Sequence, residues 1–174
     1  PDDACLGFVN TRYWRGSAVP TETLATPQAV LEWAADGPVL PGLSLEDATA
    51  LHGGLLALRE VLFRLFAAAA GRTPPAEADV AAFNAALAEA PARQRLTAGG
   101  DAYAVAATGR SAAGLLTPAL WSAAELLAGR RRAHLRQCAN PECGWLFLDD
   151  SKSGNRRWCM MSACGNRAKA RRHY

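Results

Sequence analysis

Aromatic side chains are scarce in this chain of 174 residues, and long apolar runs are missing. Aromatics make up 7% of the residues, although hydrophobic residues together make up 50%. Because alanine supplies much of that apolar content, we expect a mainly helical protein that packs through small side chains. Arg59, Arg64, Glu125 or glycines interrupt the longest apolar stretches, so none of them predicts a membrane-spanning helix.

Catalytic patterns are missing as well. The sequence contains no phosphate-binding glycine loop, no nucleophile elbow and no credible Ser/His/Asp combination. Asp149 and Asp150 resemble a carboxylate pair, but the Ser-Lys-Ser-Gly that follows them predicts a turn. His52 precedes two glycines and is more typical of a helix surface or a satisfied core residue than of a ligand. We therefore expect that the protein is not an enzyme.

Cysteine is rare, with five in all. Cys5 stands apart from the others, and its apolar neighbours predict a buried thiol rather than a nucleophile. No signal peptide is visible, and the chain opens at Pro1 without a methionine, which is compatible with further residues upstream. With no secretory signal to favour disulfides, we expect a cytoplasmic location and reduced thiols.

The other four cysteines form two close pairs near the C-terminus, Cys138-x4-Cys143 and Cys159-x4-Cys164, separated by fifteen residues. Two local pairs joined by a longer connection are typical of a tetrahedral site for one zinc ion. Two disulfides or an iron centre are the alternatives. Four thiolates leave no open position for water, so the predicted zinc is structural. His134 and His173 are possible substitute ligands that a four-cysteine set does not require.

The formal net charge is only +3, but it is distributed unevenly. From Arg130 to Tyr174, eleven lysines and arginines face three acidic residues, whereas residues 1–129 carry eight basic and thirteen acidic residues. An acidic body with a basic tail predicts a polyanionic partner for the tail.

Residues 1–132 are predicted to form a mainly helical domain. Residues 4–14 form a short apolar element, and Thr26-Pro27 is a helix start. Ser44 to Asp47 reads as a capping box for a helix that reaches about Ala70, with Gly53-Gly54 as a point where it can kink or split. Three further elements are expected: a helix from Thr73-Pro74-Pro75 with Val80, Phe83 and Leu87 inward, a hairpin around Gly99-Gly100-Asp101, and a helix capped by Thr117 with Leu120, Trp121, Leu126 and Leu127 on its apolar side.

Residues 133–174 are predicted to form the metal-binding module. Residues 138–144 read as a turn-forming knuckle, residues 145–148 as a strand, and residues 156–159 as a segment that returns to the metal. A helix is expected from about Ser162, with Cys164 in its first turn. This order of knuckle, hairpin and helix resembles a treble-clef zinc finger.

The tail is similar to the CGNR zinc finger, through CANPECGWLFLD, RRWC and the run Cys164-Gly165-Asn166-Arg167. The part before it resembles the ABATE domain, through CLGFVNT at residues 5–11 and LREVLFRLF at residues 58–66. Gly7 stands where that entry motif has an acidic residue, which puts any ligand contact of that position in doubt here. The resemblance implies a bacterial transcription regulator linked to stress.

Basic residues surround the predicted metal site, and we expect them to contact nucleic acid, although a solvated charged face is the simpler interpretation of such runs. Asn166 can read adenine, cap the helix or support the metal site. Trp145 and Trp158 can stack on bases, but packing beside the zinc is the stronger expectation. The triple Arg130-Arg131-Arg132 either interacts with a helix C-terminus or opens the nucleic-acid surface. The candidate contacts are Arg156, Arg157, Asn166, Arg167, Lys169, Arg171 and Arg172.

Three functions follow from these residues. The first is a DNA-binding transcription regulator, whose helical domain senses a small-molecule effector or forms a homodimer. The second is an RNA-binding protein that uses the same module. The third is a zinc-stabilised protein-interaction module that binds no nucleic acid.

Overall fold

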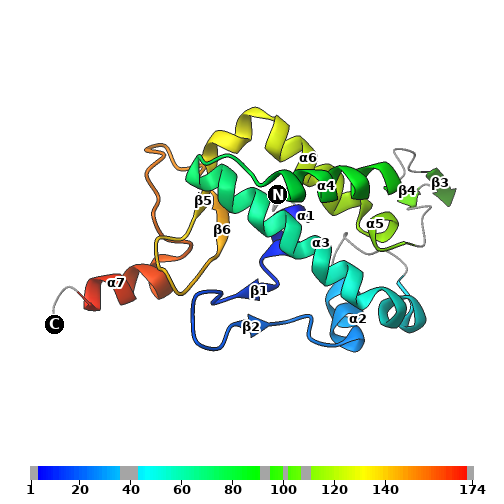
Figure 1. Cartoon of the computed structure of the whole chain (residues 1–174), viewed down its shortest axis with the longest axis horizontal. Coiled ribbons are helices and arrows are strands. Elements are labelled where there is room, and N and C mark those ends of the chain that lie inside the picture. The colour runs from blue at the N-terminus through cyan, green and yellow to red at the C-terminus, as the bar shows by residue number, and fades with distance from the viewer. Residues whose placement is uncertain (1–3, 36–42, 91–94, 100–101, 107–110, 172–174) are drawn as a thin grey trace.

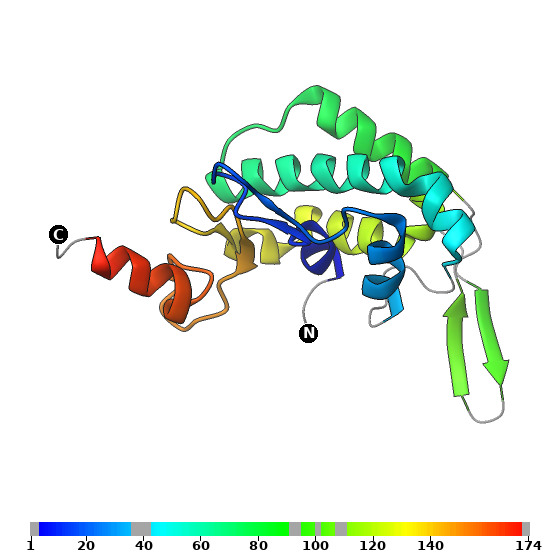
Figure 2. The same ribbon diagram turned by 90° about the horizontal axis from the view of Figure 1, so that it is seen from below.

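The computed structural model describes residues 4–35, 43–90, 95–99, 102–106 and 111–171. We call residues 4–132 the helical body and residues 133–171 the finger. The molecule is elongated, with the finger at one end and the hairpin of β3 and β4 at the other (Figures 1 and 2). The mainly helical fold predicted from the sequence, followed by a small four-cysteine finger, is confirmed.

A single long helix, α3 (Leu45–Gly71), organises the body. The Asp47 N–H donates to the Ser44 Oγ at 3.1 Å, so the predicted cap at Ser44 is confirmed. Gly53 and Gly54 do not interrupt the helix. Arg72 ends it in a left-handed conformation with φ 56° and ψ 36°, a position that glycine usually takes.

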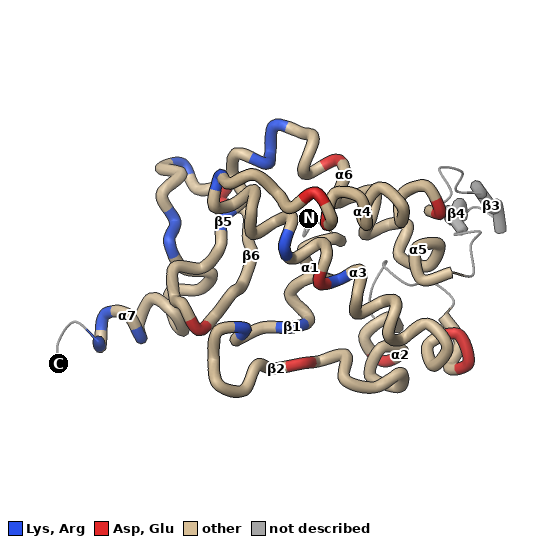
Figure 3. Tube along the Cα trace, viewed as in Figure 1, with Lys and Arg blue, Asp and Glu red and all other residues tan. Residues whose placement is uncertain are grey.

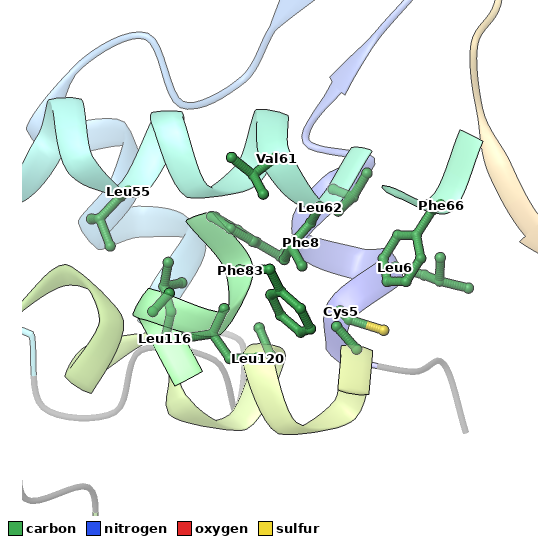
Figure 4. Packing of buried hydrophobic residues seen from close by; sticks show 14 of the residues in the cluster. Cys5, Leu6, Phe8, Leu55, Val61, Leu62, Phe66, Phe83, Leu116 and Leu120 are labelled. Carbon is green, nitrogen blue, oxygen red and sulfur yellow. The ribbon is translucent and has the colours of Figure 1, made fainter. Parts of the chain in front are cut away.

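Five shorter helices pack around α3: α1 (Ala4–Val9), α2 (Pro27–Ala35), α4 (Glu77–Glu89), α5 (Ala112–Leu115) and α6 (Thr117–Ala128). The predicted cap of α2 is confirmed, because the Ala29 N–H donates to the Thr26 Oγ1. Figure 4 shows how side chains from α1, α3, α4 and α6 meet in one apolar core. Its largest fully buried apolar side chains include Phe8, Leu55, Leu62, Phe66, Leu116 and Leu120. No helix among the described residues is both long and apolar enough to cross a membrane.

Several predicted helix details are wrong. Helix α4 begins at Glu77 rather than at Thr73, since the chain first passes through the Arg72 turn and two prolines. Thr117 does not cap α6; its hydroxyl donates to the Gly114 carbonyl at 2.6 Å and joins α6 to α5. Val80 and Trp121 are exposed instead of inward. The exposure of Val80 and Trp121 depends on which elements pack against α4 and α6, and the local sequence does not reveal those elements.

Within the described residues, the strands form three separate antiparallel pairs. β1 (Arg12–Tyr13) pairs with β2 (Thr21–Glu22), and β3 (Arg95–Gly99) pairs with β4 (Ala102–Ala106), which confirms the predicted hairpin. In the finger, β5 (Leu135–Gln137) pairs with β6 (Leu146–Leu148). The metal-binding knuckle therefore lies at the tip of the β5–β6 hairpin, and residues 156–159 return to the cysteine cluster, as predicted, without forming a strand.

A buried charge network ties α3 to the N-terminal segment. The Arg59 side chain is 1% exposed and forms ion pairs with Glu22 and Glu60, and it donates to the Thr11 Oγ1 at 3.1 Å. Arg15 donates to Glu60 at 2.6 Å and lies over the Phe63 ring. Burial by itself raises the pKa values of both glutamates, but the hydrogen bonds from the arginines outweigh burial and hold these pKa values below the usual range.

Candidate metal centre and nucleic-acid surface

The four cysteines Cys138, Cys143, Cys159 and Cys164 converge in space. Their sulfur atoms all lie within 4.8 Å of one another. The Sγ atoms of Cys143 and Cys159 are 3.7 Å apart, and those of Cys159 and Cys164 are 3.8 Å apart. Four sulfurs at about 2.3 Å from a tetrahedral zinc ion are separated by about 3.8 Å, so the set fits one zinc ion. All four thiols are free, and these distances are far too long for disulfides.

Each cysteine is placed by its local backbone. Cys138 directly follows β5, and its N–H donates to the Trp145 carbonyl across the hairpin at 2.8 Å. Cys143 closes the knuckle through its N–H bond to the Asn140 carbonyl. Cys159 precedes η2, a wide helical turn over Met161–Gly165, and Cys164 lies within that turn. α7 (Asn166–Ala170) continues from it, which confirms the predicted helix after Ser162.

Burial disfavours the thiolate forms of Cys143 and Cys159. It raises the pKa of Cys143 to about 12 and raises the pKa of Cys159 as well, with nearby thiols adding to the effect at Cys159. Burial also opposes ionisation of Cys164, but hydrogen bonds, led by the one from Asn140, lower the pKa of that thiol. A bound dication supplies the charge that holds all four sulfurs as thiolates, which is the role of a structural metal.

Aromatic rings pack against the cysteines. Phe147 is buried in this small cluster, and Trp14, Trp145 and Trp158 lie partly buried against it. Trp145 meets Tyr13 edge-on, with ring centroids 5.9 Å apart. The two finger tryptophans therefore pack beside the metal site, as expected from so small a module.

The finger is docked firmly on the body. The Asn10 side chain donates to the Leu146 carbonyl at 2.8 Å and accepts from the Leu146 N–H at 3.1 Å. The N–H groups of Arg15 and Gly16 donate to the carbonyls of Cys143 and Glu142. Leu135 and Leu146 belong to the main apolar core. We call this set of contacts the seam.

Two glycines make the close approach at the seam possible. A Cβ atom at Gly16 would lie 2.1 Å from the Pro141 carbonyl oxygen. Gly144 has a φ of 71°, and a Cβ atom there would lie 2.9 Å from the Arg15 Cβ. Trp14 also has a positive φ of 53°, which is strained for a bulky residue. The strained turn and the two glycines together bring the backbone of the body onto the knuckle.

The predicted nucleic-acid contacts lie together on the finger. Arg156, Arg157, Asn166, Arg167, Lys169 and Arg171 are all exposed, and Arg172 lies outside the described residues. Lysines and arginines gather at this end of the molecule, and acidic residues are more frequent on the body (Figure 3).

Several of these side chains also have structural partners. Arg156 lies over the Phe147 ring and donates to the carbonyls of Trp158 and Cys159. Arg167 lies over the Trp14 ring at 4.4 Å. Arg171 pairs with Glu142. The exposed Asn166 amide donates to the Ser162 carbonyl at 3.4 Å, which favours its role within the helix.

Arg157 and Lys169 have fewer structural contacts. Arg157 lies loosely over Trp158 at 5.4 Å, and no contact of the Lys169 side chain is found among the described residues. These two cations are therefore the best placed to act outside the finger.

The remaining candidates are structural. Asp149 is buried and accepts bonds from Ser151 and from the Arg156 N–H, so its pKa is lowered, first by the Ser151 hydroxyl. His134 faces Asp150 rather than the cysteines, and His173 lies outside the described residues. His52 contacts the Leu24 carbonyl through its ring, and Cys5 is buried next to Ser122.

The arginine triple lies in η1, a 3-10 helix over Arg130–His134 that follows Gly129. It does not occupy the last turn of α6, which holds no basic residue. Arg131 approaches Asp150 of the finger at 3.7 Å. Because the triple directly follows the C-cap of α6, both interpretations of it, an interaction with that helix end and a nucleic-acid surface, stay predictions.

Comparison with known families agrees with this architecture. Residues 2–130 match the ABATE family, described as "Putative stress-induced transcription regulator". Residues 134–174 match the CGNR zinc finger. The chain belongs to the ABATE family and carries a CGNR zinc finger after that domain. No curated protein matches the chain significantly.

The sequence did not reveal three residues that build the site. Asn140 donates to the Cys164 Sγ at 3.5 Å, and its place between two ligands was the available signal. Trp14 and Gly16 shape the seam, and no local pattern marked them. The CLGFVNT motif has a structural role, because its Asn10 side chain donates a hydrogen bond to the Leu146 carbonyl of the finger. Its Thr11 hydroxyl oxygen accepts a hydrogen bond from Arg59 of the body.

Proposed function

We propose that the protein is a transcription regulator that binds DNA through the finger. The observation that carries this proposal is the exposed basic surface of a metal-stapled module, with Arg157 and Lys169 least occupied by structural contacts. Backbone phosphates attract such cations, and a guanidinium can also read the edge of guanine. The helical body then holds the finger in a fixed orientation and senses an effector. A homodimer would supply the second half-site that so small a finger needs for specificity.

Rigid docking supports the proposal in a second way. The seam holds the knuckle on the body, the Ala139 N–H donates to the Arg157 carbonyl, and Arg167 of α7 lies over Trp14, so we expect little conformational entropy to be lost when these segments meet a duplex. The four thiolates and one zinc dication together carry a charge of −2, and the surrounding arginines outweigh it locally.

Fluorescence anisotropy of a labelled duplex at several salt concentrations tests the proposal. We expect affinity to fall steeply with salt, because bound phosphates release counterions. Arg157→Ala and Lys169→Ala should each weaken binding and reduce the salt slope by about one, with zinc retained. Arg64→Ala, which removes an exposed arginine of the body, is the matched control and should change neither quantity. Equal affinity for all four proteins would contradict the assignment.

The seam also favours one alternative, a zinc-stabilised module that holds the C-terminal segment on the body without nucleic acid. Such a module would use two contacts that the structure shows. The Arg167 guanidinium lies over the Trp14 ring, and Arg171 forms an ion pair with Glu142. A competition assay separates the candidates. Single-stranded RNA that displaces the duplex efficiently would favour an RNA-binding role, and binding to neither would favour the structural module.

A further inference from the structure

A hollow in the helical body opens beside the segment that leads into the finger. It lies between the C-terminal parts of α3 and α6 and the first turns of α4, and its volume is about 560 Å³. That size is typical of small-molecule pockets, which span about 300 to 1,000 Å³. The wall is mostly apolar, with Leu65, Ala69, Val80, Phe83, Ala124 and Leu127 as its main residues.

Two arginines, Arg72 and Arg132, stand at this apolar wall. A second hollow of the same volume adjoins it, shares both arginines and adds Arg130 and Arg136. None of the described residues that line the two hollows is acidic. Arg72 and Arg132 form no ion pair with a described side chain. The part of the hollow beside Arg72 and Arg132, which we call its mouth, therefore carries a positive charge that no described acidic side chain compensates.

Arg72 is held there in an unfavourable backbone conformation. Its φ of 56° lies in the left-handed region, which is energetically unfavourable for a residue other than glycine. A cation after the last turn gains some energy from the helix dipole of α3. The strained turn also directs the chain from α3 toward α4, so that residues from both helices line the hollow.

We propose that this hollow binds an amphipathic organic anion, a carboxylate attached to an aliphatic body. The carboxylate would bind Arg72 and Arg132, since a guanidinium can donate two parallel hydrogen bonds to it. The aliphatic part would pack against Leu65, Phe83 and Leu127. A small inorganic anion would contact only the arginines at the mouth, and a neutral hydrocarbon would contact only the apolar side chains of the wall.

The position of the hollow suggests how an occupant would affect the finger. Arg132 lies in η1, and its carbonyl accepts the Leu135 N–H that starts β5. Cys138 follows β5 directly, so only five residues separate Arg132 from a metal ligand. This inference rests on the effector role in the proposed function. By linkage, an occupant that shifts η1 would change DNA affinity, and DNA would change affinity for the occupant equally.

Isothermal titration of the zinc-loaded full chain with decanoate, below the concentration at which decanoate forms micelles and without DNA, tests the site. We expect one decanoate per chain. Decanol, which has the tail without the charge, and acetate, which has the charge without the tail, should each bind at least about tenfold more weakly. Decanol as tight as decanoate would contradict a role for the arginines.

Variants locate the site. Arg72→Gln and Arg132→Gln should each weaken decanoate binding about tenfold. Arg131→Gln is the matched control, because Arg131 lies in the same 3-10 helix but lines neither hollow and faces Asp150. Ala128→Phe fills the hollow from the surface of α6 and should abolish binding while the helical circular dichroism stays unchanged.

The proposal is overturned if decanoate does not bind, or if Arg131→Gln weakens binding as much as Arg132→Gln does. Because DNA is absent from this titration, failure of DNA binding would leave the result intact. A second titration with a duplex present then tests the coupling separately. Affinity for decanoate that does not change with DNA would remove the effector role but not the site.

Discussion

The helical body and the finger differ in what fills their interiors. The body packs Phe8, Phe66 and many leucines around α3, and it buries Arg59 within a network of paired charges. The buried cluster within the finger consists of three cysteines and Phe147. Apolar burial can stabilise the first without help, whereas the second needs a metal to join its parts. The seam joins the two, and it makes the small module an extension of the larger core.

Loss of the metal is expected to produce the largest difference in stability between the finger and the body. Cys164→Ser removes one of four ligands, so we expect zinc binding to weaken and the finger to unfold, with the body still helical. Native mass spectrometry should show one zinc ion in the parent protein and none in the variant. Limited proteolysis should then cut near Arg156 and Arg157 in the variant alone. Loss of all helical circular dichroism would contradict the separate stability of the body.

The body has its own point of weakness at Arg59. Arg59→Ala leaves two carboxylates without their shared partner and opens a space among buried side chains, so we expect a loss of about 3–5 kcal/mol in unfolding free energy. Urea unfolding followed by circular dichroism measures it. Arg64→Ala is the comparison, since the Arg64 side chain is 53% exposed although its partner Asp79 is largely buried, and we expect a smaller loss than for Arg59→Ala.

The seam can be opened by a single methyl group. Gly16→Ala places a Cβ atom against the Pro141 carbonyl, so we expect a loss of about 1–3 kcal/mol and an earlier unfolding transition for the finger. Gly7→Ala is the matched control, because no atom lies within 4 Å of the added Cβ, and it should leave stability unchanged or slightly higher. Limited proteolysis near Arg156 and Arg157 reports on the finger and circular dichroism on the body. If both signals changed together in Gly16→Ala, the two parts would not be separable at the seam.

Acid should weaken the body gradually. The folded-state pKa values of Glu22 and Glu60 are lowered, so their contribution to stability is complete above the ordinary glutamate pKa and is lost as the pH falls through the lowered values. We expect the urea midpoint of the body to fall below about pH 4.5. Glu22→Gln should reduce this pH dependence while it also lowers stability at neutral pH. An unchanged pH dependence would show that the network does not control acid sensitivity.

Local signals in the sequence predicted much of the fold. Ser44, Thr26 and the glycines of the β3–β4 hairpin act on their immediate neighbours, and each prediction from them is confirmed. The cysteine spacing predicted the metal site for the same reason, since each pair lies on one local turn.

Long-range contacts could not be predicted from the sequence. The contact of Asn10 with Leu146 joins segments more than a hundred residues apart. The sequence also offers alternatives of similar local quality to the pairing of β5 with β6 around the knuckle and to the strained turn at Trp14. Exposure of Val80 and Trp121 depends on which neighbours α4 and α6 acquire. Apolar periodicity gives the face of a helix but not what covers it.

We propose above all that the docked finger recognises DNA. To test this recognition, the zinc-loaded protein is incubated with sheared genomic DNA at physiological salt, and the bound fragments are recovered and sequenced. We expect enrichment of a shared short motif that is lost in the double variant Arg157→Ala/Lys169→Ala. Recovery at background level, the same for the parent protein and that variant, would contradict it.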